Sequence, residues 1–185
     1  MLNEKEENGE FLYLRGKEVF TKTFEKTIKA VNYINQKYTY NYLLTNICSF
    51  WNIHNLYKMA IDFTTEKCFT GVLTFNSFIT GTGIIMSNDV CHTLAILKPF
   101  ETDIEDVILS NILKTMYQIL PINDNVMCRL TNDEKNVIPE KKDQFLYFRI
   151  KNQDRQQDIK LFKMLLHDLY DIHFPTTINP TLRVK

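Results

Sequence analysis

The chain has 185 residues, 44% of them hydrophobic, which is enough to bury a substantial core. We therefore expect one globular domain over residues 11–172, between a polar N-terminal tail, 1–10, and an extended C-terminal tail, 173–185. The 22 Lys and Arg residues balance the 22 Asp and Glu residues, which excludes attraction of the whole chain to DNA or to an anionic membrane. Any RNA contact would need a local basic patch.

The N-terminal residues are charged and lack the apolar stretch of a signal peptide, and no apolar run reaches the length that crosses a bilayer. These features predict a cytoplasmic protein. The cysteines Cys48, Cys68, Cys91 and Cys128 are widely spaced, without a C-x-x-C motif or a close Cys/His pairing. We therefore expect reduced thiols, no metal site and no cofactor.

The first predicted elements are a strand, a helix and a second strand. Residues 11–14 are apolar and aromatic and come shortly before a glycine, which predicts a short strand. Apolar residues recur at helical spacing over 22–35, which predicts a helix. Residues 38–44 alternate tyrosines with polar residues, which predicts a half-buried strand whose aromatic face could stack bases or face a core.

Residues 47–57 contain the only tryptophan of the chain, Trp51. Ile47 and Trp51 are four positions apart and would share one face of a helix, whose start Thr45 or Asn46 could cap. Two interpretations follow. Either this is a core helix with a buried tryptophan, or its outer apolar stripe docks a partner.

The rest of the chain predicts strands and helices in alternation. Further strands are predicted over 69–75, 84–86, 92–97, 126–130 and 144–150. Further helices are predicted over 103–120, ended by Pro121, and over 154–171. Gly81-Thr82-Gly83 lacks the third glycine of a dinucleotide-binding fingerprint, so we interpret it as a turn.

Antiparallel neighbours joined by short turns, with helices between them, indicate an α+β fold. We expect one curved antiparallel sheet of about six strands, backed on one face by three α-helices. The helices would be those around Trp51, over 103–120 and over 154–171.

Residues 50–55, Phe-Trp-Asn-Ile-His-Asn, resemble the Phe-Trp-x-x-Tyr-Asn signature of the translation initiation factor 4E family of mRNA-cap-binding proteins, with His54 in place of tyrosine. The resemblance spans roughly residues 38–172, and that family's fold is a curved sheet backed by three helices. It implies that Ile47, Trp51, Leu109 and Leu113 form a groove for a partner helix, as on initiation scaffolds and repressors.

The cap site of that family sandwiches a methylated guanine between two tryptophans and holds its edge with a glutamate. One tryptophan cannot provide that sandwich. The resemblance leaves weaker candidates for cap or RNA contacts, which are aromatic, acidic or basic: Tyr38, Tyr40, Asp89, Lys135, Lys141, Lys142 and Phe148.

An enzyme is not expected. Cys91 and His92 are adjacent and would point to opposite faces of a strand, and no P-loop, paired-carboxylate or nucleophile-elbow motif is present. Three functions stay open. The chain is a divergent cap-binding-type factor that docks a protein partner, a ribosome-bound silencing or dormancy factor or adaptor that does not bind cap, or a viral or parasite-specific interaction domain.

Overall fold

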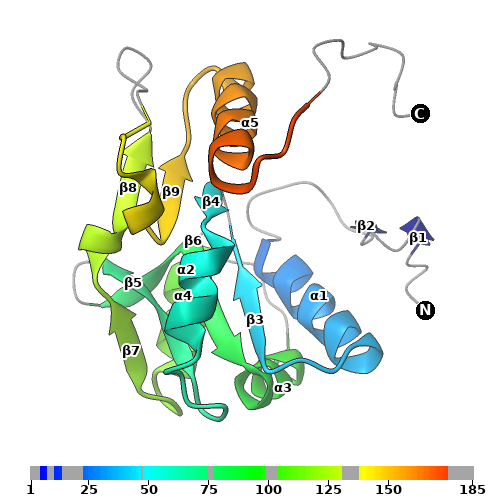
Figure 1. The fold of residues 1–185 in the computed structure, drawn as a ribbon. Coiled ribbons are helices and arrows are strands. Elements are labelled where there is room, and N and C mark those ends of the chain that lie inside the picture. Colours follow the sequence, from blue (N-terminus) through cyan, green and yellow to red (C-terminus); the bar gives the residue numbers. More distant parts are fainter. Residues whose placement is uncertain are drawn as a thin grey trace. The chain divides into compact units, whose positions relative to one another are not determined.

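The computed structural model describes residues 5–7, 11–13, 23–46, 48–74, 77–98, 104–130 and 138–174. It confirms the α+β class, with five α-helices and strands that alternate along the chain (Figure 1). The described chain forms two compact units. Unit 1 comprises Met1–Ile47 and Ala60–Asp124, and unit 2 comprises Cys48–Met59 and Asn125–Lys185.

The sheet of unit 1 has four strands, in the order β3-β6-β5-β7. Its strands are β3 (Tyr42–Thr45), β6 (Phe78–Ser87), β5 (Phe69–Thr74) and β7 (Ile119–Ile122). β6 is antiparallel to β3 and to β5, whereas β7 runs parallel to β5. A further pair, β1 (Lys5–Glu7) and β2 (Phe11–Tyr13), is antiparallel.

Three helices supply most of the remaining core of unit 1. They are α1 (Thr23–Lys37), α3 (Asn88–Ala95) and α4 (Glu105–Leu113). The α1 side chains Phe24, Ile28 and Val31, at helical spacing, are buried in one cluster with residues of β6, α3 and α4. Gly71 of β5 belongs to the same packing, because an added Cβ would lie 2.6 Å from the carbonyl oxygen of Gly83.

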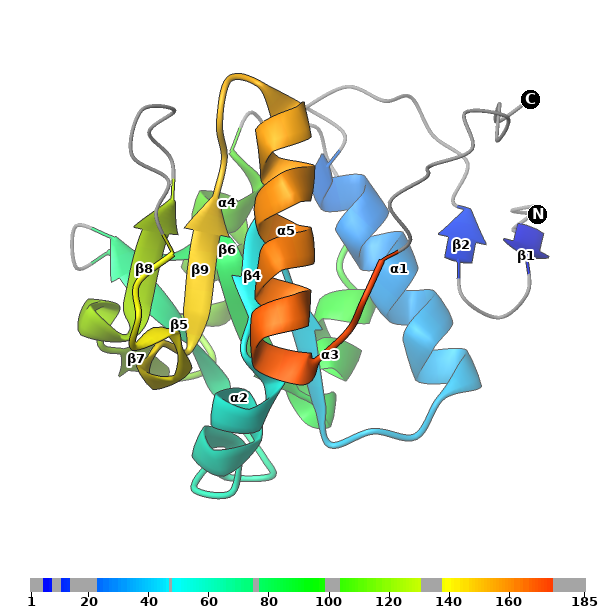
Figure 2. The ribbon, with the colours of Figure 1, turned by 45° about the horizontal axis from the view of Figure 1, so that its top comes forward.

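The sheet of unit 2 has three strands, in the order β4-β9-β8. They are β4 (Ser49–Trp51), β9 (Tyr147–Ile150) and β8 (Met127–Leu130), with β4 antiparallel and β8 parallel to β9. The helices are α2 (Ile53–Ala60) and α5 (Arg155–Tyr170), with the short 3-10 turns η2 (Asp124–Val126) and η3 (Lys142–Gln144). α5 lies along one face of this sheet (Figure 2), and its Leu161 and Leu165 pack against buried Phe148.

The expectation of one curved antiparallel sheet is wrong, because the strands form separate four-stranded and three-stranded sheets, each with a parallel pair. Parallel neighbours require a long crossover connection. In unit 1 the chain from the end of β6 through α3 and α4 to β7 provides it. Counting predicted hairpins along a sequence does not reveal such a crossover.

Three further predictions of secondary structure are wrong. Residues 92–97, predicted as a strand, overlap α3, which buries Val90, Cys91 and Leu94. The predicted turn Gly81-Thr82-Gly83 lies inside the long strand β6. The predicted helix 103–120 ends at Leu113, and Pro121 lies in β7, an edge strand where a missing N–H is tolerated.

Candidate functional site

Trp51 lies on strand β4 and not on a helix, so the prediction of a helix over 47–57 is wrong. Cys48, with φ of 53°, interrupts regular structure, and β4 then pairs with β9, with Trp51 opposite Tyr147. The two rings stack, with centroids 4.7 Å apart and planes inclined by 13°. Only 5% of Trp51 is exposed, so its side chain is core.

Asn52 caps the start of helix α2. Its Oδ1 accepts a hydrogen bond from the Asn55 backbone N–H at 3.3 Å, as a helix cap does, and its own N–H donates to the Leu146 carbonyl at 2.9 Å. The cap expected at Thr45 or Asn46 is wrong, because Thr45 lies in β3 and α2 starts only at residue 53.

Asn55 forms hydrogen bonds with the segment that precedes β9. Its Nδ2 donates to two backbone carbonyls, those of Asp143 at 2.5 Å and Phe145 at 2.9 Å. Both asparagines of the Phe-Trp-Asn-Ile-His-Asn motif therefore form hydrogen bonds that stabilise the local structure. The motif is explained by the junction between a strand and a helix.

Tyr170, the last residue of α5, closes this junction from the other side. Its hydroxyl accepts a hydrogen bond from the Ile53 N–H at 2.6 Å and donates to the Trp51 carbonyl at 3.5 Å. Its ring lies 5.3 Å from that of His54, centroid to centroid. The start of α2 is thus held at the C-terminal end of α5.

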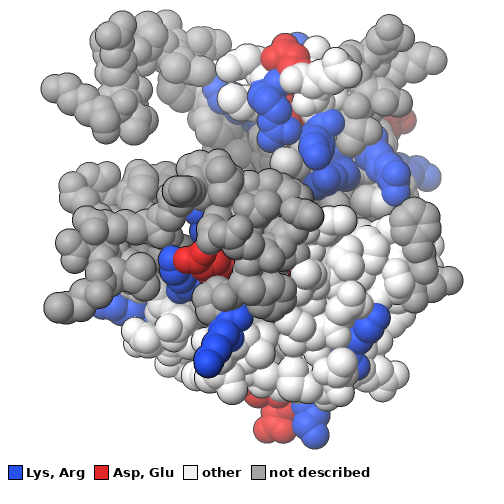
Figure 3. All heavy atoms as spheres, turned by 180° about the vertical axis from the view of Figure 1, so that it is seen from behind, with Lys and Arg blue, Asp and Glu red and all other residues white. Residues whose placement is uncertain are grey.

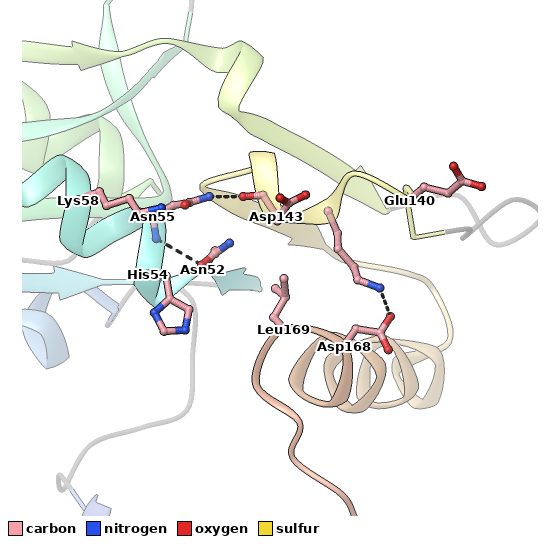
Figure 4. Close-up of a pocket in the computed structure, with 9 residues that line it drawn as sticks. Asn52, His54, Asn55, Lys58, Glu140, Asp143, Asp168 and Leu169 are labelled. Atoms are coloured by element: carbon pink, nitrogen blue, oxygen red, sulfur yellow. Dashed lines mark hydrogen bonds and ion pairs between the residues drawn. The ribbon is translucent and has the colours of Figure 1, made fainter.

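An open cleft of about 490 Å³ lies within unit 2 (Figure 4). Residues of α2 and the cap before it line one side, residues near the end of α5 line another, and the segment around η3 lines the third. The lining residues are Asn52, His54, Asn55, Lys58, Glu140, Lys142, Asp143, Asp168 and Leu169. The cleft is therefore mainly polar and carries charges of both signs.

Charged side chains of the cleft form an ion pair, which a neighbouring histidine extends. Lys142 Nζ lies 2.7 Å from Asp168 Oδ2, and His167 Nδ1 lies 3.0 Å from Asp168 Oδ1. The hydrogen bond from His167 and then that from Lys142 lower the pKa of Asp168 below its usual value, against the opposing effect of burial. Asp168 is therefore a carboxylate at neutral pH.

Helix α2 has no fully buried residue, although five of its eight residues are hydrophobic. Ile53 and Tyr57, four positions apart on one face, are 55% and 70% exposed. Their face adjoins the one that carries His54 and Lys58 into the cleft. We call Ile53 and Tyr57 the α2 apolar stripe.

The four predicted docking residues do not form one exposed stripe. Leu109 and Leu113 are 1% and 0% exposed and belong to the core cluster of unit 1. Trp51 is buried on its sheet, and Ile47 lies outside the described residues. On α2 it is Ile53 and Tyr57 that present apolar surface.

The candidates for cap contacts in unit 1 have different settings. Tyr38 is 52% exposed, just after α1. Tyr40 donates a hydrogen bond to Asn35 Oδ1, and burial raises the pKa of its hydroxyl. Asp89 accepts hydrogen bonds from the Lys67 N–H, at 3.0 Å, and from Ser87 Oγ, at 2.5 Å, which hold a loop onto α3.

The candidates for cap or RNA contacts in unit 2 also differ in their surroundings. Phe148 is 0% exposed in the core, so neither face of its ring is open to a base. Lys142 is paired with Asp168, Lys141 is exposed beside it, and Lys135 lies outside the described residues. On the face shown in Figure 3, most of the Lys and Arg side chains gather in the upper part of the view, and the uncharged surface below carries few of them.

The thiols are free, as expected. Burial raises the pKa of Cys68 and of Cys91 to about 11 each, and it also raises the pKa of Cys128. Cys91 and His92 are adjacent on α3, so the strand geometry expected for them is wrong.

Within the described part of the chain, one group of side chains could hold a metal ion. It consists of His167, Asp171 and His173, which the sequence analysis missed. The pattern His-x-x-x-Asp-x-His across the end of a predicted helix was the available signal.

Compared with known proteins, the sequence matches no protein family and no curated protein. Of the helices in the described ranges, none combines the length and the apolar character needed to span a bilayer.

Proposed function

We propose that the chain is a non-catalytic protein-binding factor that receives a short segment of a partner on the α2 apolar stripe and the adjoining cleft. The observation that carries the proposal is the exposure of Ile53 and Tyr57 on a helix that has no fully buried residue. Apolar side chains grouped next to polar ones are typical of interaction sites. Tyrosine is among the residues that contribute most at such sites.

The chemistry of the surface favours an amphipathic partner segment. Ile53 and Tyr57 offer an apolar anchor, while Lys58 and Glu140 on the cleft offer one cationic and one anionic contact. A helix or extended peptide with apolar residues on one side and charged residues of both signs on the other would satisfy both parts. α2 is held in place by Asn52, Asn55 and Tyr170, so the surface is ordered before the partner arrives.

The same geometry favours binding over catalysis. A cysteine nucleophile acts as its thiolate, and a pKa of about 11 keeps Cys68 and Cys91 protonated at neutral pH. In the cleft, Asn52 and Asn55 are engaged with backbone groups, and Lys142 and Asp168 neutralise one another. These groups stabilise the cleft and leave its rim for a ligand.

The proposed setting is translation in the cytoplasm, and it rests on the resemblance of residues 50–55 to the initiation factor 4E signature. The partner would then be an initiation scaffold, a repressor or a ribosomal component. A ring spacing of 4.7 Å leaves no room for a base between Trp51 and Tyr147. Cap binding would therefore depend on Tyr38, whose ring is half exposed.

Site-specific photocrosslinking tests the binding surface. A photoreactive phenylalanine derivative replaces Tyr57 on α2 in one variant and Ile159, 47% exposed on α5, in the control. We expect a partner that crosslinks at position 57 and not at 159. The purified partner should then bind the native chain at least about 30-fold more tightly than Tyr57→Ala, the effect of a hot-spot residue. Equal crosslinking at both positions, or equal affinity for both proteins, would overturn the proposal.

Two further experiments test the proposed role in translation separately from the binding surface. They are equilibrium dialysis against a methylated cap analogue and cosedimentation with ribosomes. Saturable cap binding that Tyr38→Ala abolishes would support a cap-binding factor. Ribosome binding without cap binding would support a ribosome-bound adaptor. If neither ligand binds, the translation setting is wrong, while the crosslinking result still decides whether the α2 surface binds a partner.

A further inference from the structure

The turn after α5 brings together two histidines and one aspartate from seven consecutive residues. α5 ends at Tyr170, and Asp171 adopts the left-handed conformation, with φ of 56° and ψ of 31°. The Asp171 N–H donates to the His167 carbonyl at 2.9 Å, and the Ile172 N–H donates to the Leu166 carbonyl at 3.3 Å. The chain therefore turns back along the helix (Figure 2), and the rings of His167 and His173 meet with centroids 4.7 Å apart.

We propose that His167, Asp171 and His173 form a binding site for a divalent transition-metal ion, of which zinc is the best match. Each residue offers one ligand atom, and these atoms all lie within 4.8 Å of one another. Two imidazoles and one carboxylate are a ligand set that zinc accepts, with a fourth position left for water.

The spacing of the ligand atoms is close to that of a tetrahedral site. Ligand atoms about 2.0–2.1 Å from zinc lie about 3.3 Å from each other in a tetrahedron. Asp171 Oδ1 and His173 Nε2 are already 3.1 Å apart. The side chains of His167, Asp171 and His173 are 52%, 90% and 71% exposed, so small rotations can close the remaining distance and an ion can enter from solvent.

Two features of the surroundings support a cation at this place. Asp168 Oδ1 accepts a hydrogen bond from His167 Nδ1 at 3.0 Å, and Lys142 anchors the other oxygen of the same carboxylate at 2.7 Å. A carboxylate on one ring nitrogen orients a ligating histidine and leaves Nε2 for the metal. The group also lies at the C-terminal end of α5, where the helix dipole favours positive charge.

The test is zinc binding by the full chain, measured by competition with a coloured chelator. We expect one ion per chain, and at least about 10-fold weaker binding for His167→Ala, His173→Ala and Asp171→Asn, the last of which keeps the left-handed turn. Asp168→Asn should weaken binding by about 10-fold through the orientation of His167. His92→Ala, an exposed histidine of α3, should bind zinc like the native chain.

Cobalt substitution gives an independent readout, because a tetrahedral site with nitrogen and oxygen ligands yields intense visible absorption that octahedral surface binding lacks. We expect this absorption in the native chain and in His92→Ala, and its loss in His167→Ala. The side chains of His167, Asp171 and His173 are mostly exposed, so circular dichroism should show the native fold when any of them is replaced. Absence of saturable binding, or equal losses in His92→Ala and His167→Ala, would overturn the site.

Discussion

Replacing Trp51 with alanine distinguishes a core tryptophan from a docking tryptophan. The side chain is 5% exposed and stacked on Tyr147, so its removal opens a cavity on the sheet of unit 2. Large-to-small substitutions of buried aromatic residues cost about 3–5 kcal/mol of unfolding free energy. The lost ring stack accounts for about 0.5–1.5 kcal/mol within that range. For a chain of this size, a loss of about 4 kcal/mol lowers Tm by about 8–16 °C.

The assay is urea unfolding followed by far-UV circular dichroism, because fluorescence would lose its only tryptophan in the variant. Tyr57→Ala is the matched control, since its ring is 70% exposed and its loss should change the unfolding free energy by less than about 0.5 kcal/mol. The native protein should also show the blue-shifted emission of a tryptophan out of water. If Trp51→Ala costs less than about 1 kcal/mol and the native emission is that of an exposed indole, the packing argument fails.

Three further predictions concern other parts of the chain. Gly71→Ala should lower the unfolding free energy by more than about 2 kcal/mol in urea titrations, because the new methyl group would lie 2.6 Å from the backbone oxygen of Gly83; unchanged stability would contradict this. Asn55→Ala should cost about 1–3 kcal/mol in the same assay, because two loop carbonyls lose their donor, and a cost near zero would mean that water replaces the amide. The thiols of Cys68 and Cys91 should resist alkylation in the native protein until the pH approaches about 11, whereas in urea they should react as ordinary thiols; rapid native labelling at pH 8 would show that they are not buried.

The elements that could be predicted from the sequence are those whose signal is local. α1 has its buried residues at helical spacing. α5 begins just after Asp154, the first residue of the predicted helix 154–171, and Asp154 Oδ1 accepts a hydrogen bond from the Gln156 N–H at 2.9 Å. The α+β class follows from such elements. Their assembly into two sheets does not, because the pairing of β5 with β7 and of β8 with β9 depends on contacts between distant parts of the chain.

In the candidate site, too, the local pattern could be predicted from the sequence, whereas the strand pairing could not. Residues 47–57 have an apolar pattern that fits a helix. Residues 49–51 nevertheless form strand β4, because they pair with the backbone of β9. That shift buries Trp51 and turns Ile53 and Tyr57 outward. A sequence pattern identifies the apolar residues, but a displacement of the helix start by a few residues changes which of them reach solvent.

The composition of unit 2 has a consequence for how the chain folds during synthesis. β4 pairs with β9 through Ser49 and Arg149, one hundred positions later, whereas β5 and β6 of unit 1 are joined by a short hairpin. Unit 1 can therefore assemble once residue 124 has left the ribosome, while β4 keeps an unpaired edge until β9 emerges. During that interval Phe50 and Trp51 lack their partners on β9, so the nascent chain is prone to association, or to capture by a chaperone, at the segment that later forms the edge strand β4 of unit 2.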